Sequence, residues 1–265
     1  MTTTLPNQVD ADVELALPSA ATRAIAPTRA LVFGDRRIPL DGSDRPLFHI
    51  AKRFLDLVAS AVALVALSPL IAVLATAIAV SSRGPILYRQ QRWGSRRRVA
   101  PDGVVEWEAR LFTCIKFRTM VWQADESPHV RHVEAFVRGQ LPSADNDGFK
   151  LRRDPRVTRV GRALRTTSLD ELPQILNVLA GQMSIVGPRP VPPYEVATYP
   201  ADRCLARLGA LPGITGPWQV DGRSSVPFEA MMKLDLEYVA HPSLRRDLSL
   251  ILRTVPCILR RRGAQ

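Results

Sequence analysis

The pattern of apolar and polar positions changes abruptly at residue 57. From Leu57 to Val80, the run LVASAVALVALSPLIAVLATAIAV holds 24 residues without a charged side chain. A helix of this length would extend roughly 36 Å, at ~1.5 Å per residue, and could cross a bilayer. Because the run is apolar on every face, it is not typical of a helix in a soluble core. The pattern therefore predicts a membrane segment.

Ser68 and Pro69 stand at the midpoint of this run and divide it into two arms. Proline removes a backbone donor and kinks a helix, and the Ser68 hydroxyl could satisfy a carbonyl that the kink leaves free. Each arm of about 12 residues would reach ~18 Å, which is roughly mid-bilayer. The two residues indicate a helix-break-helix that enters the membrane and returns.

Basic residues flank the run on both sides. They are Lys52 and Arg53 before it, and Arg83, Arg89, Arg92 and Arg96–Arg98 after it. Positive charge near a membrane segment favours the cytoplasmic side. A re-entrant segment keeps both flanks on that side, whereas a true crossing places one of them outside. We favour the re-entrant topology and keep the crossing as the alternative.

The remaining sequence predicts a tail and one globular domain. Residues 1–50 contain five prolines and no clear apolar period, which indicates a flexible tail. Residues 51–92 would form the membrane segment and its connection, and residues 93–265 a cytoplasmic domain. Within that domain, alternation predicts a short strand in 84–94 and strands around a hairpin in 104–120.

Helical periodicity marks three later segments. It predicts helices at 160–181, ending at Gly181 as a C-cap, and at 227–243, ending near His241 and Pro242. Residues 244–263 mix apolar and basic positions, so this segment either lies on a membrane surface or packs on the domain core. The expected fold is α+β and mainly helical: a small domain with a short β-hairpin or sheet, on a re-entrant membrane helix with amphipathic interfacial helices.

Composition points to an anionic partner and gives no sign of a metal or disulfide framework. The chain has 265 residues, 46% of them hydrophobic, and a formal net charge of +11. Such an excess suits nucleic acid, an anionic membrane or a phosphorylated substrate. The three cysteines are widely spaced, which favours reduced, structural roles. His129 and His132 lack further Cys or His nearby, so a solvated pair is favoured over a zinc site.

Asp170 and Glu171 form the most informative polar pair in the chain. Ser168 and Glu171 have the spacing of a capping box, so both acids could be ordinary residues of a helix start. Pro173 argues against this, because proline fits best in the first turn of a helix. It moves the expected helix start to about 170–172 and leaves the two carboxylates at the end of a loop.

That position suits phosphate chemistry. A helix N-terminus attracts anions. A carboxylate can attack phosphorus and hold the transferred group covalently, and a second carboxylate can bind Mg²⁺, which neutralises phosphate oxygens. Asp170 and Glu171 could divide these two roles between them.

Basic residues near the pair strengthen this interpretation. Lys116 and Arg118 alternate along an expected strand and would share one face. Arg162 and Arg165 precede the acids, and Arg189 follows them between two prolines that stiffen its backbone. A rigid arginine fork suits a diphosphate or a nucleotide. Exposed charges or salt-bridge partners remain the alternative for each, with more weight for Arg162 than for Arg189.

Five motifs follow one another in order over about residues 50–263. They are KRFLDL before the Ser-Pro run, FTCIKFRTM, LRTTSLDELPQILNVLAGQMSIVGPRP, PGITGPWQVDGRS and LDLEYV. With these motifs the chain resembles the bacterial polyprenyl-phosphate sugar-1-phosphate transferases, the monotopic phosphoglycosyltransferases, in their short form. Its GPWQVDGRS version is similar to members that start exopolysaccharide repeats with a hexose phosphate. Glucose and galactose are the sugars that the resemblance favours.

The resemblance implies a two-step mechanism at the membrane of a bacterium. Asp170 would attack the β-phosphate of a UDP-sugar and release UMP, and undecaprenyl phosphate would then accept the sugar-phosphate from Asp170. Glu171 matches the partner acid and expected Mg²⁺ ligand. The Ser-Pro pair matches the break of a re-entrant helix, which places the domain on the cytoplasmic leaflet. The expected substrate-binding residues are Lys116, Arg118, Arg165, Gln174, Asn177 and Arg189.

Two other functions compete with this one. Asp145-Asn146-Asp147 has the D-x-D form of a conventional glycosyltransferase, which would release UDP instead of UMP. Being short and alone in a polar stretch, it is more typical of a loop. A basic membrane-anchored protein that binds nucleic acid is disfavoured because the chain lacks a recognisable binding motif. We therefore expect no nucleic-acid partner, and the sequence predicts no particular oligomeric state.

Overall fold

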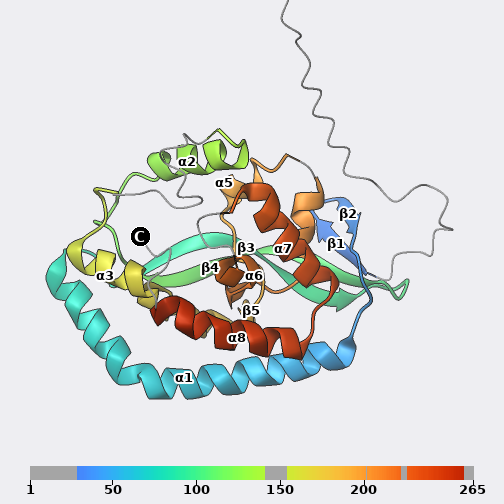
Figure 1. Cartoon of the computed structure of the whole chain (residues 1–265), viewed down its shortest axis with the longest axis horizontal. Helices are drawn as coiled ribbons and strands as arrows, with labels where there is room; N and C mark the ends of the chain where they lie inside the picture. The colour runs from blue at the N-terminus through green and yellow to red at the C-terminus, as the bar shows by residue number, and fades with distance from the viewer. Residues whose placement is uncertain (1–28, 141–153, 201, 222–225, 260–265) are drawn as a thin grey trace, which may run out of the picture.

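The long apolar run lies within a single helix, α1 (Pro46–Ser81), which bends partway along its length (Figure 1). The computed structural model of the chain describes residues 29–140, 154–200, 202–221 and 226–259, without the side chains of 202, 203, 258 and 259. Pro69 lies inside α1 and cannot donate to the carbonyl of Val65. The Ser68 hydroxyl donates to that carbonyl instead, at 2.8 Å. The expected compensation by Ser68 is thereby confirmed, although α1 continues through the expected break.

A four-stranded sheet forms the centre of the domain, with strand order β2-β1-β4-β3. The strands are β1 (Arg29–Phe33), β2 (Arg36–Pro39), β3 (Leu87–Val99) and β4 (Val105–Phe117). β3 and β4 pair antiparallel over their whole length, from Leu87 opposite Phe117 to Val99 opposite Val105. The hairpin expected inside 104–120 is therefore wrong: this segment is one strand. The turn falls at 100–104, where Gly103 has φ +79°.

The N-terminal part of the sheet corrects the expected tail. Residues 29–39 form an antiparallel hairpin, and β1 also pairs parallel to β4 from Arg29 opposite Val105. The Arg29 side chain is buried and donates to the carbonyls of Val239, at 2.9 Å, and Asp41, at 3.0 Å. Its strand is held by distant parts of the chain, which local composition does not reveal. Residues 1–28 lie outside the described residues.

The helices surround the sheet on two sides. They are α2 (Ser127–Val137), α3 (Arg159–Thr167), α4 (Gln174–Leu179), α5 (Pro193–Val196), α6 (Pro217–Asp221), α7 (Phe228–Ala240) and α8 (Leu244–Leu259). Short 3₁₀ helices span Leu169–Glu171 (η2) and Asp202–Leu208 (η3), and β5 (Ser184–Val186) pairs parallel to β6 (Gly213–Thr215). Figure 1 shows α1 and α8 along one side of the sheet and α2 on the opposite side. The fold is mixed α+β, as expected, and about half helical, which is less than the mainly helical fold that the sequence predicts.

Both ends of α1 are attached to the same domain. Near its start, Lys52 forms an ion pair with Asp247 of α8 at 2.6 Å, and Arg53 donates to the carbonyl of Val178 at the end of α4, also at 2.6 Å. Near its end, Ile78 is buried in a cluster with Phe117 and Leu164. The residues that flank the apolar run on its two sides thus meet one globular body.

A direct ion pair joins the chain just before α1 to the chain after it. The Arg97 Nε of β3 donates to Asp44 Oδ1 at 3.1 Å, two residues before α1 begins. Arg118 of the segment after β4 donates to the carbonyls of Ser82 and Arg83, each at 2.7 Å, and so caps the end of α1. Several basic flanking residues therefore make specific contacts within the protein.

Much of α1 and one stripe of α8 expose large apolar side chains. On α1 these are Leu47, Ile50, Phe54, Leu55, Leu57, Val58, Val62, Val65, Leu70, Val73 and Val80. On α8, Leu248, Leu252 and Val255 are exposed while Leu250 is buried in the core. A surface of this extent is typical of contact with a membrane or a partner. For α8, packing on the core is confirmed on one face only.

Candidate active site

Asp170 and Glu171 lie on a sharp turn between two helices. α3 ends at Thr167, and Ser168 follows in the left-handed conformation with φ 57°. The chain then forms the 3₁₀ turn η2, and α4 begins at Gln174 with Pro173 as its N-cap. The single helix expected over 160–181 is therefore wrong. The inference from Pro173 is confirmed, because the two carboxylates precede the helix instead of belonging to it.

The turn borders a cavity of about 700 Å³. Its walls come from α1, β3, β4, the segment 117–126, α2, η2 and residues 188–190, the Pro-Arg-Pro segment. Among the described residues, the non-glycine residues with positive φ are Gln123 and Ser168, and both line this cavity. Left-handed backbone costs about 1 kcal/mol or more in such residues and is concentrated at functional sites. The two left-handed residues therefore point to this cavity as the candidate functional site.

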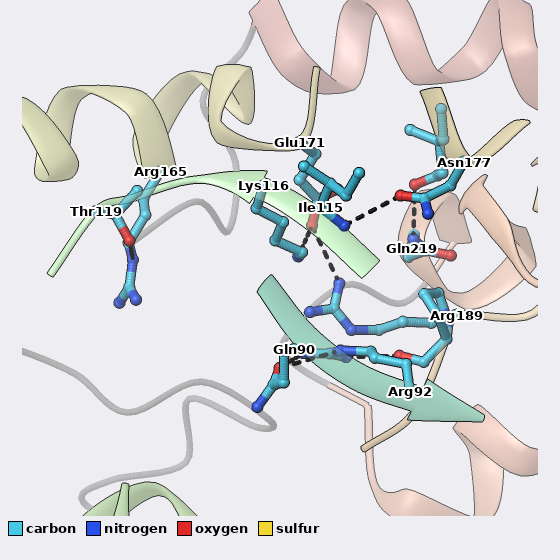
Figure 2. A network of polar contacts seen from close by, with 12 residues as sticks. Gln90, Arg92, Ile115, Lys116, Thr119, Arg165, Glu171, Asn177, Arg189 and Gln219 are labelled. Carbon is cyan, nitrogen blue, oxygen red and sulfur yellow. Dashed lines mark hydrogen bonds and ion pairs between the residues drawn. The ribbon is translucent and has the colours of Figure 1, made fainter. Parts of the chain in front are cut away.

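Glu171 is the meeting point of two cations. Lys116 of β4 places its Nζ 2.7 Å from Glu171 Oε1, and Arg189 places its Nη1 3.5 Å from the same oxygen (Figure 2). All three side chains are largely but not completely buried. This arrangement brings together three of the residues expected at the site, from positions 116, 171 and 189. Lys116 and Arg189, the two donors of this group, line the cavity, where their positive charges would offset those of a phosphate group.

Arg165 stands on α3 beside the acidic turn. Its Nε donates to Thr119 Oγ1 at 2.9 Å, and burial lowers the pKa of its guanidinium while Asp170 partly offsets this. Gly161 lets α3 approach closely, since a Cβ there would lie 1.9 Å from the Thr119 carbonyl oxygen. The Thr158 hydroxyl caps α3 by accepting from Gly161 N. These contacts hold Arg165 in the cavity wall near Asp170.

The Pro-Arg-Pro segment is held by its carbonyl groups. Proline has no N–H, so Pro188 and Pro190 cannot anchor the segment as donors. Four successive carbonyls, at 188 to 191, each accept a hydrogen bond. The donors in order are Gly213 N at 2.8 Å, Arg207 Nη2 at 3.5 Å, Arg92 Nη1 at 2.6 Å and Trp93 N at 2.8 Å. The expected rigid support for Arg189 is therefore built from three other parts of the chain.

One of these donors belongs to a buried charge network. Arg207 forms ion pairs with Asp235 at 2.6 Å and with Glu195 at 3.4 Å, and it donates to the Tyr199 hydroxyl at 2.7 Å. Burial raises the pKa of Asp235 to about 6, although Arg207 lowers it. Removing one partner of such a buried pair costs about 3–5 kcal/mol. The LDLEYV motif, which contains Asp235, therefore supports the segment that carries Arg189.

Two of the expected substrate-binding residues do not line the cavity. Gln174 is buried at the start of α4. Asn177 accepts from Ile115 N at 3.0 Å and donates to the Thr113 carbonyl at 2.8 Å. β1 pairs with β4 only as far as Glu108, so this edge of β4 lacks a strand at 113–115. Asn177 takes the place of that strand and fastens α4 to the sheet.

Arg118 lines the cavity but uses its donors elsewhere. As described above, its guanidinium caps the end of α1, and it also donates to the Ser82 hydroxyl at 3.0 Å. Lys116 and Arg118 both line the cavity, although β4 ends at Phe117 and Arg118 lies beyond it; Lys116 contacts Glu171, whereas Arg118 contacts Ser82 and Arg83. The structure therefore places Arg118 as a link between the end of α1 and the cavity.

Several lining residues were missed by the sequence interpretation. Tyr88, Gln90 and Arg92 alternate on one face of β3 and line the cavity, a period of two that the sequence does contain. The sequence pattern indicates Arg92 only as a basic residue that flanks the apolar run. His129 also lines the cavity instead of standing in solvent, and burial, aided by Arg92, lowers its pKa to about 4. The Asp145-Asn146-Asp147 motif lies outside the described residues.

The acidic pair is compatible with a bound Mg²⁺. Within the described ranges, no group of three or more His, Cys, Asp or Glu side chains converges as a complete metal site. Mg²⁺ is usually held by one or two carboxylates together with waters and substrate phosphates. Asp170 and Glu171, which line the same cavity, supply that donor set. The residues therefore fit a magnesium ion that binds together with a phosphorylated substrate.

Comparison with known proteins gives consistent matches. The sequence model of the family described as bacterial sugar transferase matches residues 47–261. The exopolysaccharide production protein ExoY of Rhizobium meliloti (strain 1021) is 38% identical over 226 residues, covering 84% of this chain and 92% of that protein. The undecaprenyl-phosphate galactose phosphotransferase of Salmonella typhimurium is 39% identical over 214 residues, covering 80% of this chain and 41% of that protein. The UDP-glucose:undecaprenyl-phosphate glucose-1-phosphate transferase of Caulobacter vibrioides is 40% identical over 222 residues, covering 81% and 72%.

Proposed function

Because the chain belongs to the bacterial sugar transferase family, we propose that it transfers a sugar-1-phosphate from a UDP-sugar to undecaprenyl phosphate, as the first step of exopolysaccharide synthesis. Relatives are named as glucose and galactose phosphotransferases, and this chain is an enzyme of the same class. UDP-glucose and UDP-galactose are therefore the proposed donors. The observation that carries the proposal is the Asp170–Glu171 turn, which faces a cation-lined cavity bordered by the apolar helix α1.

In the proposed first step, a carboxylate oxygen of Asp170 forms a bond to the β-phosphorus of the donor. The bond from that phosphorus to the bridging oxygen of the diphosphate breaks, and UMP leaves with the electron pair. Lys116 and Arg189 flank Glu171 and offer donors to the phosphoryl oxygens, whose charge develops during the step. Arg165, on the neighbouring helix, adds a further positive charge beside Asp170.

In the proposed second step, a phosphate oxygen of undecaprenyl phosphate attacks the same phosphorus. The bond between Asp170 and phosphorus breaks, which restores the carboxylate and yields an undecaprenyl diphosphate sugar. Ala59, Ser60 and Ala63 of α1 form part of the cavity wall, so the lipid acceptor can reach the turn from the membrane side. Glu171, together with Asp170, is the proposed Mg²⁺ site. When bound there, the ion would neutralise phosphate oxygens so that an anionic nucleophile can approach.

The released nucleotide tests the reaction directly. Purified enzyme in detergent is incubated with undecaprenyl phosphate, Mg²⁺ and a panel of UDP-sugars, and the nucleotide products are separated. We expect UMP to be released with UDP-glucose or UDP-galactose. Release of UDP instead would support the alternative, a conventional glycosyltransferase, and would contradict the proposal.

The attachments of α1 support a re-entrant topology on the cytoplasmic leaflet of the bacterial inner membrane. Among the described residues, α1 is the one helix long and apolar enough to cross a bilayer. Its two ends contact one domain, and Asp44 before it pairs with Arg97 after it. A crossing would place these partners on opposite sides of the membrane and break the ion pair. The bend at Pro69 would return the chain to the leaflet that it entered.

Cysteine labelling tests this topology. Ser43 and Arg89 are exposed on either side of α1, and Cys257 is the free cysteine that is not buried in the described structure. In a Cys257→Ser background, we expect Ser43→Cys and Arg89→Cys both to react with a membrane-impermeant maleimide in inverted vesicles, and neither to react in spheroplasts. Reaction of the two positions from opposite sides would establish a crossing instead.

A further inference from the structure

The cavity extends from the membrane helix to the far side of the domain. Ala59, Ser60 and Ala63 of α1 line one end of it. His129 of α2 and Tyr194 of α5 line another part. Figure 1 shows α2 on the opposite side of the sheet from α1, and α5 contacts α2. Residues of η2 line the same cavity, and its part at α2 and α5 lies on the side of the sheet opposite α1, where a soluble substrate would enter.

His129 and Tyr194 form a paired aromatic wall. Their ring centroids lie 6.1 Å apart with an interplanar angle of 86°, which is an edge-to-face arrangement. Burial raises the pKa of the Tyr194 phenol to about 12, so it remains a neutral donor. Tyr88 stands in the same wall, and its hydroxyl donates to Glu126 Oε1 at 2.6 Å. Aromatic rings are surfaces on which a nucleobase can stack, and the polar edges of these rings can form hydrogen bonds with it.

Arginines connect this wall to the reacting turn. Arg189 contacts Glu171 at 3.5 Å and lies close enough to His129 to help lower its pKa. Arg92 lowers the pKa of His129 more than Arg189 does. Its Nη1 donates to the Pro190 carbonyl of the Pro-Arg-Pro segment at 2.6 Å. A nucleoside diphosphate has this order of groups: a base, then a ribose, then two phosphates. Its phosphates would meet the arginines while the base reaches the aromatic wall.

We propose that His129 and Tyr194 bind the pyrimidine base of the donor nucleotide and set its nucleotide specificity. The inference rests on the proposed function, because it assigns one part of the same substrate. A neutral imidazole offers one N–H donor and one acceptor, whereas an imidazolium offers donors only. The hydrogen-bonding edge of uracil also contains both kinds of group. Because the pKa of His129 is about 4, its imidazole stays neutral throughout the physiological pH range.

Product inhibition tests this assignment in the full-length enzyme. The inhibition constants of UMP, CMP and ribose 5-phosphate are measured against the best UDP-sugar for the wild type and for His129→Ala and Tyr194→Leu. Each substitution should weaken UMP inhibition about tenfold, which is the value of one lost hydrogen bond to a buried group. Inhibition by ribose 5-phosphate should change less than twofold, and the donor KM should rise while kcat changes little. The preference for UMP over CMP should shrink in His129→Ala.

His132→Ala is the matched control, since His132 is on the same helix but does not line the cavity. It should keep the wild-type constants, and thermal denaturation should show that all three variants are folded. Failure of the wild type to release UMP from any UDP-sugar would contradict the proposed function itself. A wild type that does release UMP, combined with unchanged UMP inhibition in both cavity variants, would overturn the present inference alone. A change in sugar preference without a change in UMP inhibition would overturn it too and would assign the wall to the sugar.

Discussion

The variant Asp170→Asn should lose at least about ten-thousandfold in turnover, the range observed when a catalytic nucleophile is removed. An amide has nearly the same shape as a carboxylate but does not attack phosphorus, so no sugar-phosphate can attach to the enzyme. The turn η2 should keep its fold, because its strain is at Ser168 and its boundary is at Pro173. UMP release measures the turnover. Mass spectrometry of the intact protein, incubated with donor but without acceptor, measures the covalent adduct.

A control separates the chemical role of Asp170 from a general effect of lost charge. Asp35→Asn changes an exposed acid in the turn between β1 and β2, far along the chain from η2. This variant should keep both the turnover and the adduct of the wild type. Near-normal UMP release by a folded Asp170→Asn enzyme would exclude Asp170 as the nucleophile.

The variant Arg189→Lys should lower kcat/KM for the UDP-sugar by about 10²–10³-fold, comparable to removal of one donor that stabilises developing charge. Lysine keeps the positive charge but lacks the planar fork that can hold two oxygens at once. The backbone of the segment should be retained, because carbonyls, not the Arg189 side chain, accept the hydrogen bonds that hold it. Steady-state kinetics gives the change, and thermal denaturation shows whether the fold is preserved.

Arg162→Lys serves as the matched control for this variant. Arg162 is exposed on α3, close in sequence to the acidic turn, and does not line the cavity. It should behave as the wild type in both measurements. If Arg189→Lys retained the kcat/KM of the wild type, a rigid guanidinium at this position would not be needed, and the proposed role of Arg189 would be wrong.

The position of the acidic pair could be predicted because its causes are local. Proline restricts the chain at Pro173, and the helix must begin around it whatever the rest of the protein does. The Ser68 hydroxyl could be assigned to a freed carbonyl for the same kind of reason, since its partner is only three residues away. Rules of this type depend on the residue and its immediate neighbours, which the sequence displays directly.

The roles of Asn177 and Arg118 depend on distant parts of the chain. Both residues lie in motifs that also carry the acidic pair or Lys116, so proximity in sequence suggested substrate binding. Asn177 bonds to β4 because β1 stops pairing with that strand at Glu108. Arg118 bonds to the carbonyl groups just after α1 because that helix ends nearby in space. Neither termination can be inferred from residues close to 118 or 177. The strands of residues 29–39 are not predicted for the same reason, since β1 is held in the sheet by β4, which begins at residue 105.

Because α1 supplies part of the cavity wall, this apolar helix cannot be treated as a removable appendage. Deleting α1 would expose the apolar residues that pack against Ile78. It would also remove the ion pair of Lys52 with Asp247 on α8 and the hydrogen bond of Arg53 to the Val178 carbonyl on α4, and it would open one side of the cavity. A truncated soluble fragment would then be an incomplete enzyme, even with every acid and arginine of the site present. Detergents and nanodiscs that preserve the bend of α1 thus become part of any meaningful assay, since α1 forms part of the cavity wall.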